Sequence, residues 1–342
     1  MLEELESLTR SQFSLPKEAP FFFTPIFKGG SGRNFYRFQL PSKQSLILMH
    51  YSGEREENFL YSEIGKFLEE LGVPVPHIEA HDSQNRVVWM EDLGNKDIYS
   101  HKEASWKVRN SIYQKTLVAA KRLHDQGWPL ALRKNLTLMP GFDARLYQWE
   151  RDYFFENFIE RVCGLYLSVS ERKALEKEMQ GLTNDLLKER ICLVHRDFQS
   201  QNVILKKNEV YFIDFQGTRT GTFFYDLASL LYDPYVFFKQ SERIELLDFY
   251  FKLEPKTDLA WELFQKRWHA AALQRLMQAL GAYGFLGLVK GKTEFLHSIP
   301  AALSNLKVVT DQLEGLPQFK RLLNKVIDKM KTEGQEVCEK EE

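Results

Sequence analysis

A short polar segment between two apolar runs constrains this chain more than any other feature. Residues 193–205 read LVHRDFQSQNVIL, and a second apolar run, YFIDFQG, follows at residues 211–217. These runs predict short strands that fix the loop between them. Asp197 and Asn202 are five residues apart on this loop, and Asp214 lies at the end of the next strand. The spacing predicts that three oxygen-bearing side chains meet at one site.

These residue types suit phosphoryl transfer. An Asp on a loop can accept the proton of a hydroxyl as that oxygen attacks phosphorus, which makes Asp197 the candidate base. Asn202 and Asp214 can supply the hard oxygen ligands that Mg²⁺ prefers. Protein kinases divide the roles in this way between H-R-D-x-x-x-x-N and a later metal-binding Asp. A lone His-x-Asp is usually only a hydrogen-bonded pair, but the whole constellation indicates a kinase-like site.

The chain divides by composition into two lobes. Residues 1–94 contain aromatic and branched runs between Gly, Pro and Ser, which predicts a strand-rich lobe that covers a nucleotide. Residues 95–330 mostly follow helical periodicity and would carry the catalytic and acceptor-binding groups. Residues 331–342 form a polar tail. The sequence therefore predicts an α+β, protein-kinase-like two-lobed fold, with a strand-rich N-lobe and a mainly helical C-lobe.

Three of the expected helices have recognisable ends. Residues 55–71 place apolar side chains near helical spacing, and Gly72 follows as a typical stop. Residues 111–127 also read as a helix, and their last residue is a Gly that we expect to end it. Ser168 and Glu171 fit a capping box at the start of another helix.

Charge and cysteine content exclude several classes of protein. The 342 residues include 46 Lys and Arg and 47 Asp and Glu, so no basic field would draw the chain to nucleic acid or an anionic membrane. Cys163, Cys192 and Cys338 show neither metal-ligand spacing nor a disulfide framework, which is typical of a reducing compartment. We expect a cytoplasmic protein with a small-molecule substrate, no nucleic acid or membrane partner, and no obligate protein partner.

The motifs HRDFQSQN, IDFQ and YDLASLL resemble those of the aminoglycoside phosphotransferase/choline kinase-like superfamily. There, H-x-D-x-x-x-x-N is followed by I-D-F or I-D-W and by a helix that starts with Y-D-L-A. Further segments, among them GGSGRNFYRF, GVPVPHI and LQRLMQALGAYGFL, make the chain similar to the sugar kinases of bacterial cell-wall recycling. Those enzymes phosphorylate N-acetylmuramate and N-acetylglucosamine at the anomeric hydroxyl. The resemblance covers most of the chain and implies a sugar kinase that uses ATP and Mg²⁺.

Carried over by position, the resemblance implies a phosphate-covering turn and an adenine-binding hinge. Glycines let backbone N–H groups approach phosphate oxygens closely, although an ordinary hairpin turn would have the same composition. At the hinge, backbone groups at the edge of a strand would pair with adenine. The residues concerned are Gly29, Gly30, Ser31 and Gly32 in the turn, and Glu91, Asp92 and Leu93 at the hinge.

The resemblance also implies structural support for the loop. Asp226 is expected to lie buried beneath the loop and to accept hydrogen bonds from its backbone N–H groups. We expect His195 to bond to the strand that carries Asp214 and not to act as a base.

One feature departs from the general kinase pattern. Kinases place a Lys on the third strand to hold the nucleotide phosphates. Here that position falls on Met49 or His50, within SLILMHY. Arg33 is our first candidate for the replacing cation and Lys28 our second, although both also fit the solvated charges of a hairpin.

The acceptor is expected to lie over the candidate base. The segment DARLYQWERDYFFENF can offer Glu150 or Arg145 to sugar hydroxyls, although a core-facing aromatic helix would have the same pattern. Gln216 and Arg219 follow directly after Asp214. Arg219 can meet a carboxylate, such as a lactyl group, through its planar fork of donors.

Two alternatives stay open from the sequence. The first is a kinase of the same class for another acceptor: an aminoglycoside, choline, homoserine or another sugar. The second is a nucleotide-binding pseudoenzyme, which the missing strand Lys would permit. Asp197, Asn202 and Asp214 together argue against the pseudoenzyme, because a binding module needs no base.

Overall fold

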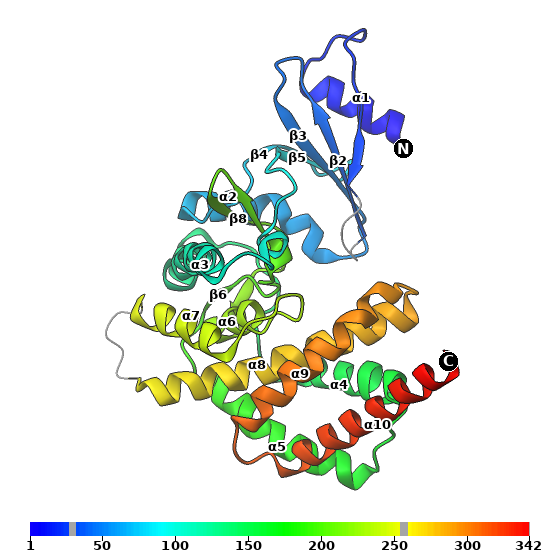
Figure 1. Ribbon diagram of the computed structural model, residues 1–342. Helices are drawn as coiled ribbons and strands as arrows, with labels where there is room; N and C mark the ends of the chain where they lie inside the picture. Colours follow the sequence, from blue (N-terminus) through cyan, green and yellow to red (C-terminus); the bar gives the residue numbers. More distant parts are fainter. Residues whose placement is uncertain (27–31, 254–258, 342) are drawn as a thin grey trace.

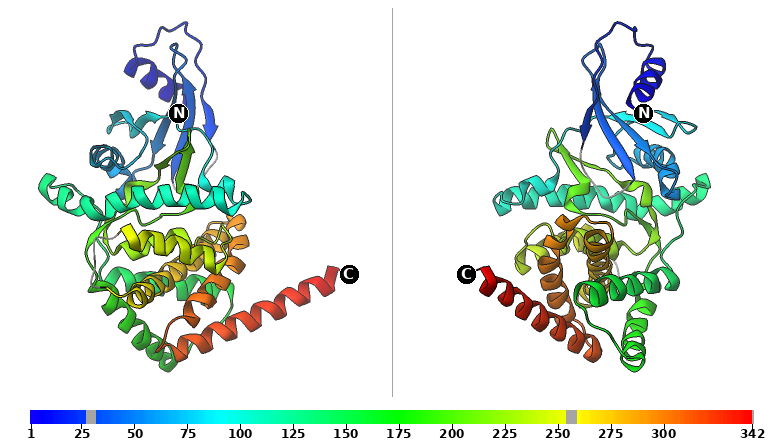
Figure 2. Two further views of the ribbon diagram at one scale, coloured as in Figure 1. Left: turned by 60° about the vertical axis from the view of Figure 1, so that its left-hand side comes forward. Right: turned by 90° about the vertical axis from the view of Figure 1, so that its right-hand side faces the viewer.

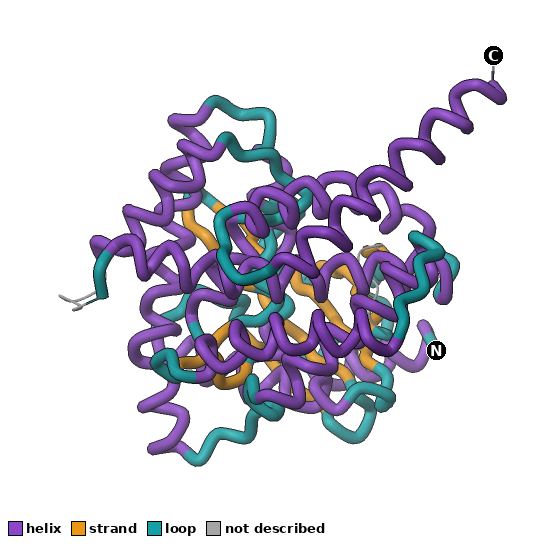
Figure 3. The backbone as a smooth tube through the Cα atoms, turned by 90° about the horizontal axis from the view of Figure 1, so that it is seen from below, coloured by secondary structure: helices purple, strands orange, loops and turns teal. Residues whose placement is uncertain are grey.

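A computed structural model describes residues 1–26, 32–253 and 259–341, with side chains as far as residue 332. Figure 1 shows a small lobe of strands above a larger body of helices. Seen from the helical end, helices cover most of the molecule and the strands lie behind them (Figure 3). This arrangement confirms the predicted two-lobed α+β fold.

The N-terminal lobe is built on one antiparallel sheet of five strands in the order β1-β2-β3-β5-β4. Of its two longest strands, β2 is rich in aromatic residues and β3 in aliphatic ones, and both alternate or bury side chains that pack on the cores described below. The strands are β1 (Thr24–Ile26), β2 (Arg33–Gln39), β3 (Ser45–Tyr51), β4 (Ile78–Asp82) and β5 (Val87–Glu91).

Each face of this sheet buries a different core. The outer face carries Phe38 and Trp89, which pack with Leu5 of helix α1 (Leu2–Gln12). The indole Nε1 of Trp89 donates to the Thr9 hydroxyl at 3.0 Å. The inner face packs against the main core of the protein. Our sequence analysis missed α1 because its exposed acidic residues hide a short apolar stripe.

Helix α2 (Tyr61–Leu71) packs beneath the inner face, after a 3₁₀ turn, η1 (Glu56–Leu60). Its apolar residues recur at helical spacing, so one side is buried and the other is solvated. Gly72 ends α2 with φ of 78°, a left-handed conformation that glycine adopts without strain. The predicted helix and its stop are therefore confirmed.

The prediction that the next long helix stops at Gly127 is wrong. Helix α3 (Trp106–Lys134) continues through Pro129 and ends at Asn135, which is left-handed. A side chain at Gly127 would approach Leu193 to 3.1 Å. Gly127 therefore allows α3 to pass close to the strand before the loop, a tertiary reason that the local sequence does not reveal.

The helical lobe surrounds one central helix, α8 (Trp261–Gly284), in which every residue from Trp268 to Gly281 is buried. The capping box of Ser168 and Glu171 is present at the start of α5. The other helices are α4 (Ala144–Phe154), α5 (Val169–Leu187), α6 (Phe223–Leu231), α7 (Gln240–Leu253), α9 (Ile299–Asp311) and α10 (Pro317–Glu341). Two π-helical segments, η3 (Phe155–Val162) and η6 (Phe285–Val289), follow α4 and α8.

Helix α10 projects from the body at its C-terminal end (Figure 2). Its backbone extends through most of the segment predicted as a polar tail, residues 331–342. Within the described part of the chain, no helix is long and apolar enough to cross a membrane.

Candidate active site

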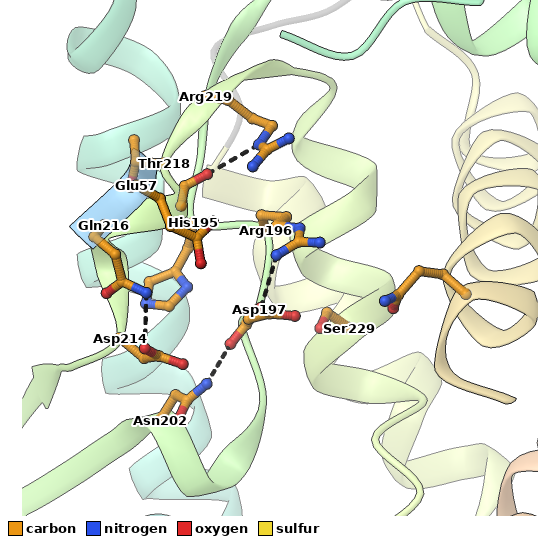
Figure 4. Close-up of polar contacts among 12 residues, drawn as sticks. Glu57, His195, Arg196, Asp197, Asn202, Asp214, Gln216, Thr218, Arg219 and Ser229 are labelled. Carbon is orange, nitrogen blue, oxygen red and sulfur yellow. Dashed lines mark hydrogen bonds and ion pairs between the residues drawn. The ribbon is translucent and has the colours of Figure 1, made fainter. Parts of the chain in front are cut away.

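Two short strand pairs hold the ends of the polar loop. Strand β6 (Cys192–Val194) pairs with β9 (Arg219–Gly221), and β7 (Val203–Lys206) pairs with β8 (Glu209–Phe212). Their apolar side chains are largely buried, so the loop at residues 195–202 begins and ends on fixed supports. Figure 4 shows the polar side chains that gather around this loop.

Two buried carboxylates hold the loop from below. Asp226, on α6, is 0% exposed and accepts the backbone N–H groups of His195 at 2.7 Å and Arg196 at 2.9 Å. Asp233 accepts the N–H and the hydroxyl of Ser200, at 2.8 and 2.5 Å. Because these donors are backbone groups or a short side chain, the carboxylates fix the path of the chain.

His195 links the loop to the neighbouring strand. Its ring Nε2 lies 2.9 Å from the carbonyl oxygen of Ile213, the residue before Asp214. Since a carbonyl only accepts, this nitrogen carries the proton. The ring is buried, so the structure places His195 as a tie between two segments and away from solvent.

Asp197 combines an accessible carboxylate with two flanking cations. Its side chain is 32% exposed, with Arg196 Nη1 3.2 Å from Oδ2 and Arg275 Nη2 3.6 Å from Oδ1. Burial raises the pKa of Asp197, but the positive charges, Arg196 first, outweigh it and hold the pKa below its ordinary value. The carboxylate is therefore ionised at neutral pH and can accept a proton.

Asn202 and Asp214 present oxygens beside Asp197. Asn202 Nδ2 donates to the Asp197 carbonyl at 2.8 Å, which turns the amide oxygen away from that contact. Asp214 has φ of 63° and is 30% exposed; its Oδ1 accepts from Gln216 Nε2 at 3.0 Å and contacts the Arg33 guanidinium. An amide oxygen and a carboxylate are donors that fit Mg²⁺. Among the described residues, no group of three or more His, Cys, Asp or Glu side chains could hold a metal ion, so a metal here would depend on the Asn202 amide as well as on carboxylates.

The turn predicted to cover phosphates falls largely outside the described residues, which exclude Gly29, Gly30, Ser31 and the alternative cation Lys28. Gly32 lies next to Ser52, whose N–H donates to the Gly32 carbonyl at 3.1 Å.

The third strand supplies no cation toward the loop. Met49 is fully buried in the main core. His50 lies on the opposite face; burial first, and then the charge of Arg86, lowers its pKa. Arg33 is the cation that the structure brings to Asp214.

The segment predicted as an adenine-binding hinge is held by contacts from both lobes. Arg37, on β2, donates to the Asp92 carboxylate through Nε at 2.6 Å and Nη2 at 2.9 Å. Lys206, on β7, donates to the Glu91 carboxylate at 2.7 Å and the Asp92 carbonyl at 2.9 Å. Leu93 follows and is buried.

On the acceptor side, strand pairing brings Arg219 next to the loop. Arg219 pairs with Val194 across β6 and β9, and its Nε donates to the Gly217 carbonyl at 3.0 Å. Within the described part of the chain, its terminal nitrogens make no hydrogen bond. Burial, followed by the nearby charge of Arg196, lowers the pKa of Arg219. Gln216 is buried beside Asp214.

The two candidate sugar-binding residues on α4, Glu150 and Arg145, lie in different environments. Glu150 is 1% exposed, and its oxygens accept from Tyr225 at 2.8 Å and Gln274 at 2.9 Å, while burial raises its pKa. Arg145 is exposed on the same helix. The burial of Glu150 favours the alternative of a core-facing helix. Trp149 is 51% exposed, and its ring stacks on that of Tyr153 with centroids 5.0 Å apart.

Sequence reasoning missed several residues that complete the site. Arg196 was visible within the His-Arg-Asp motif, and its φ of 77° marks a strained backbone before Asp197. Asp233 follows two Leu and a Tyr at the end of α6, where only tertiary packing shows that it reaches the loop. Arg275, interpreted from the sequence as a buried tie between helices, does donate from α8 to the Ser229 hydroxyl of α6 through Nε at 3.1 Å, and its Nη2 also reaches Asp197. Glu57, of the other lobe, also reaches this group of side chains (Figure 4).

The fold and this loop together define a kinase-like phosphotransferase. The chain belongs to the phosphotransferase enzyme family (APH), whose family model matches residues 23–262.

Relatives of known function also match over most of the chain. An N-acetylmuramate/N-acetylglucosamine kinase of Neisseria meningitidis serogroup B is 24% identical over 86% of this chain and 87% of its own. The enzyme of the same name from Pseudomonas aeruginosa is 22% identical over 89% and 88%.

Solved structures share the fold at low identity. A choline/ethanolamine kinase family protein of Mesorhizobium loti has a TM-score of 0.60 and 14% identity, covering 94% of this chain and 99% of its own. The streptomycin–ATP complex of APH(2")-IIa has a TM-score of 0.57 and 17% identity, covering 85% and 97%. At these identities the likeness shows the fold alone.

Proposed function

We propose that this protein transfers the γ-phosphoryl group of ATP, with Mg²⁺, to the anomeric hydroxyl of an N-acetylated amino sugar, N-acetylmuramate or N-acetylglucosamine. The observation that carries the proposal is Asp197: a partly exposed carboxylate, held ionised by Arg196 and Arg275, beside Asn202 and Asp214. The acceptor class is supported by the N-acetylmuramate/N-acetylglucosamine kinases that match most of the chain.

In this mechanism Asp197 orients the acceptor hydroxyl toward the phosphorus and accepts its proton. An anomeric hydroxyl is more acidic than an ordinary alcohol, so a carboxylate of low pKa suffices as the base. Asp226 and Asp233 keep the loop in place while the proton moves. Asn202 and Asp214 would hold Mg²⁺, which offsets charge that develops on the transferred group.

The nucleotide is proposed to lie between the lobes. Backbone groups of Glu91 and Leu93 would pair with adenine, on a hinge that Arg37 and Lys206 hold rigid. The turn at residues 29–32 would cover the phosphates, and Arg33 would supply positive charge where kinases have a strand Lys.

The charges around Asp197 favour an uncharged or acidic acceptor. Arg196, Arg219 and Arg275 all lie close enough to lower the pKa of Asp197. Such a field disfavours the cationic alternatives, aminoglycosides and choline. The fork of Arg219 can pair with the lactyl carboxylate of N-acetylmuramate, and Gln216 can bond to the sugar.

The acceptor can be tested directly. The full-length protein is incubated with ATP and Mg²⁺ and one of five acceptors: N-acetylmuramate, N-acetylglucosamine, glucosamine, kanamycin or choline. Products are located by ³¹P NMR. A sugar 1-phosphate from either N-acetylated sugar supports the proposal, whereas phosphorylation of kanamycin or choline alone, or of none of the five, contradicts it.

The proposed base is tested by Asp197→Asn. Loss of a general base costs roughly two to four decades in kcat, while nucleotide should still bind because the hinge is unchanged. Asp311→Asn makes the same chemical change at an exposed position that pairs with Lys307 on α9, and should leave kcat unchanged. Wild-type turnover in Asp197→Asn would remove Asp197 from the mechanism.

A further inference from the structure

The inner face of the N-terminal sheet carries a buried arginine, Arg33, at the start of β2, next to the turn proposed to cover the nucleotide phosphates. Residues two apart in a strand share a face, so Arg33, Phe35 and Arg37 of β2 point the same way. Phe35 packs against the main core, and Arg37 contacts Asp92 at the hinge. The Arg33 side chain is only 5% exposed, and its guanidinium forms an ion pair with Asp214.

This ion pair joins the two lobes at the candidate metal ligand. Asp214 Oδ1 contacts Arg33 and also accepts from Gln216 Nε2 at 3.0 Å. Phe215, directly after Asp214, packs on Tyr61 of α2 with ring centroids 4.7 Å apart. The position of Asp214 is therefore set by packing, and Arg33 approaches it from the opposite lobe.

We propose that Arg33 is a two-position cation, which pairs with Asp214 before nucleotide binds and with the nucleotide phosphates once a metal ion occupies Asp214. A guanidinium and a divalent cation repel each other when both lie within a few ångströms of one carboxylate, and the Arg33 side chain that would have to share Asp214 is buried. Either ion can neutralise Asp214, but the two cannot share it closely. The inference rests on the proposed use of ATP and Mg²⁺ and is independent of the acceptor.

If this exchange occurs, removing Arg33 should strengthen the binding of a metal ion alone and weaken the binding of a metal–nucleotide complex. A metal ion alone must displace Arg33, so it binds the native protein weakly. A metal–nucleotide complex supplies the metal for Asp214 and phosphates for Arg33 together, so it gains from both. Arg33 thus contributes to a coupling between the two ligands, and couplings of this kind typically amount to about 5- to 150-fold.

The experiment measures metal affinity directly, with Mn²⁺ as the probe and free Mn²⁺ followed by electron paramagnetic resonance. For Arg33→Met in the full chain, we expect Mn²⁺ alone to bind about 5-fold or more tightly than to wild type. We expect Mn²⁺ with a non-hydrolysable ATP analogue to bind about 10-fold more weakly. Asp214→Asn should abolish the Mn²⁺ site, which locates the probe. Arg161→Met, which removes an exposed arginine that pairs with Glu156, should leave both affinities unchanged.

The outcomes separate this inference from the acceptor proposal. Mn²⁺ affinity that is unchanged or weaker in Arg33→Met overturns the exchange, as does a wild-type protein that binds neither Mn²⁺ nor nucleotide. If the two Mn²⁺ affinities shift in opposite directions but no sugar phosphate is formed, the exchange is supported and only the proposed acceptor is contradicted. If Arg33→Met does not fold, as judged by circular dichroism, Arg33→Gln removes the same charge while keeping a polar side chain and should shift both affinities in the same directions.

Discussion

Asp226→Asn perturbs the support of the loop with almost no change in shape. The native carboxylate accepts three groups: the N–H of His195, the N–H of Arg196 and the ring Nε2 of His124 at 3.1 Å. An Asn side chain keeps one oxygen but replaces the other with an NH₂ group. At least one backbone N–H would then face another donor in a site with no exposure to solvent.

The expected cost follows from these contacts. A hydrogen bond to a charged group contributes about 1.5–3 kcal/mol, and a buried donor left without a partner costs about 1–3 kcal/mol. One lost contact of this kind therefore predicts a destabilisation of about 2–4 kcal/mol. For a chain of this size that corresponds to a fall in Tm of roughly 3–6 °C. A loop displaced by about 1 Å would lower kcat by about 100-fold.

Thermal unfolding followed by circular dichroism gives the Tm, and steady-state kinetics with the best acceptor gives kcat and KM. The KM for nucleotide should change little, because the hinge does not contact Asp226. Asp143→Asn is the matched control: Asp143 caps α4 by accepting the Leu146 N–H at 2.7 Å, and Asn caps a helix about as well. A Tm within about 2 °C of wild type and a kcat within threefold for Asp226→Asn would refute the argument.

Two further predictions concern the helical lobe. Burial lowers the pKa of His269 to about 4, so between pH 6.5 and 4 the unfolded chain takes up a proton that the folded protein refuses. The contribution of His269 to stability is therefore present above pH 6.5 and is lost as the pH is lowered, by about 2 kcal/mol between pH 7.5 and 5. The His269→Phe variant lacks this titration, so its Tm should differ less between these two pH values than the Tm of wild type. An equal difference in Tm would contradict the assignment. A Cβ at Gly284 would lie 2.2 Å from the Asn157 carbonyl, so Gly284→Ala should force α8 from η3 and destabilise the protein by about 1–3 kcal/mol, measurable as a lower Tm; an unchanged Tm would show that the helices can separate freely.

The predictions that held rest on local chemistry. The N-terminal sheet, α2 with its Gly72 stop and the capping box at Ser168 were all predicted from spacing and composition. Hydrophobic periodicity and capping residues act within a few positions of one another, so a sequence carries them openly. Spacing also predicted that Asp197, Asn202 and Asp214 lie near one another, because one loop and one strand carry them; their roles in catalysis and metal binding stay predictions.

Other predictions failed or were missing where distant contacts decide. Gly127 reads as a helix stop, but α3 needs it to pass Leu193. For Glu150 the sequence left a sugar ligand and a core-facing helix both open, and only the contacts with Tyr225 and Gln274 show that it lies in the core. Helix α1 was missed because its exposed acidic residues hide a short apolar stripe, whose packing is completed by the distant Trp89 on β5.

The sequence alone determined the two-lobed class, the loop and the oxygen-bearing residues of the site, since each follows from order and spacing along the chain. Only the tertiary structure decided how charge is distributed there. It placed Arg275 of α8 against Asp197 and Arg33 of β2 against Asp214, across 78 and 181 positions of sequence. Electrostatic interactions depend on distance through space, and folding alone sets that distance.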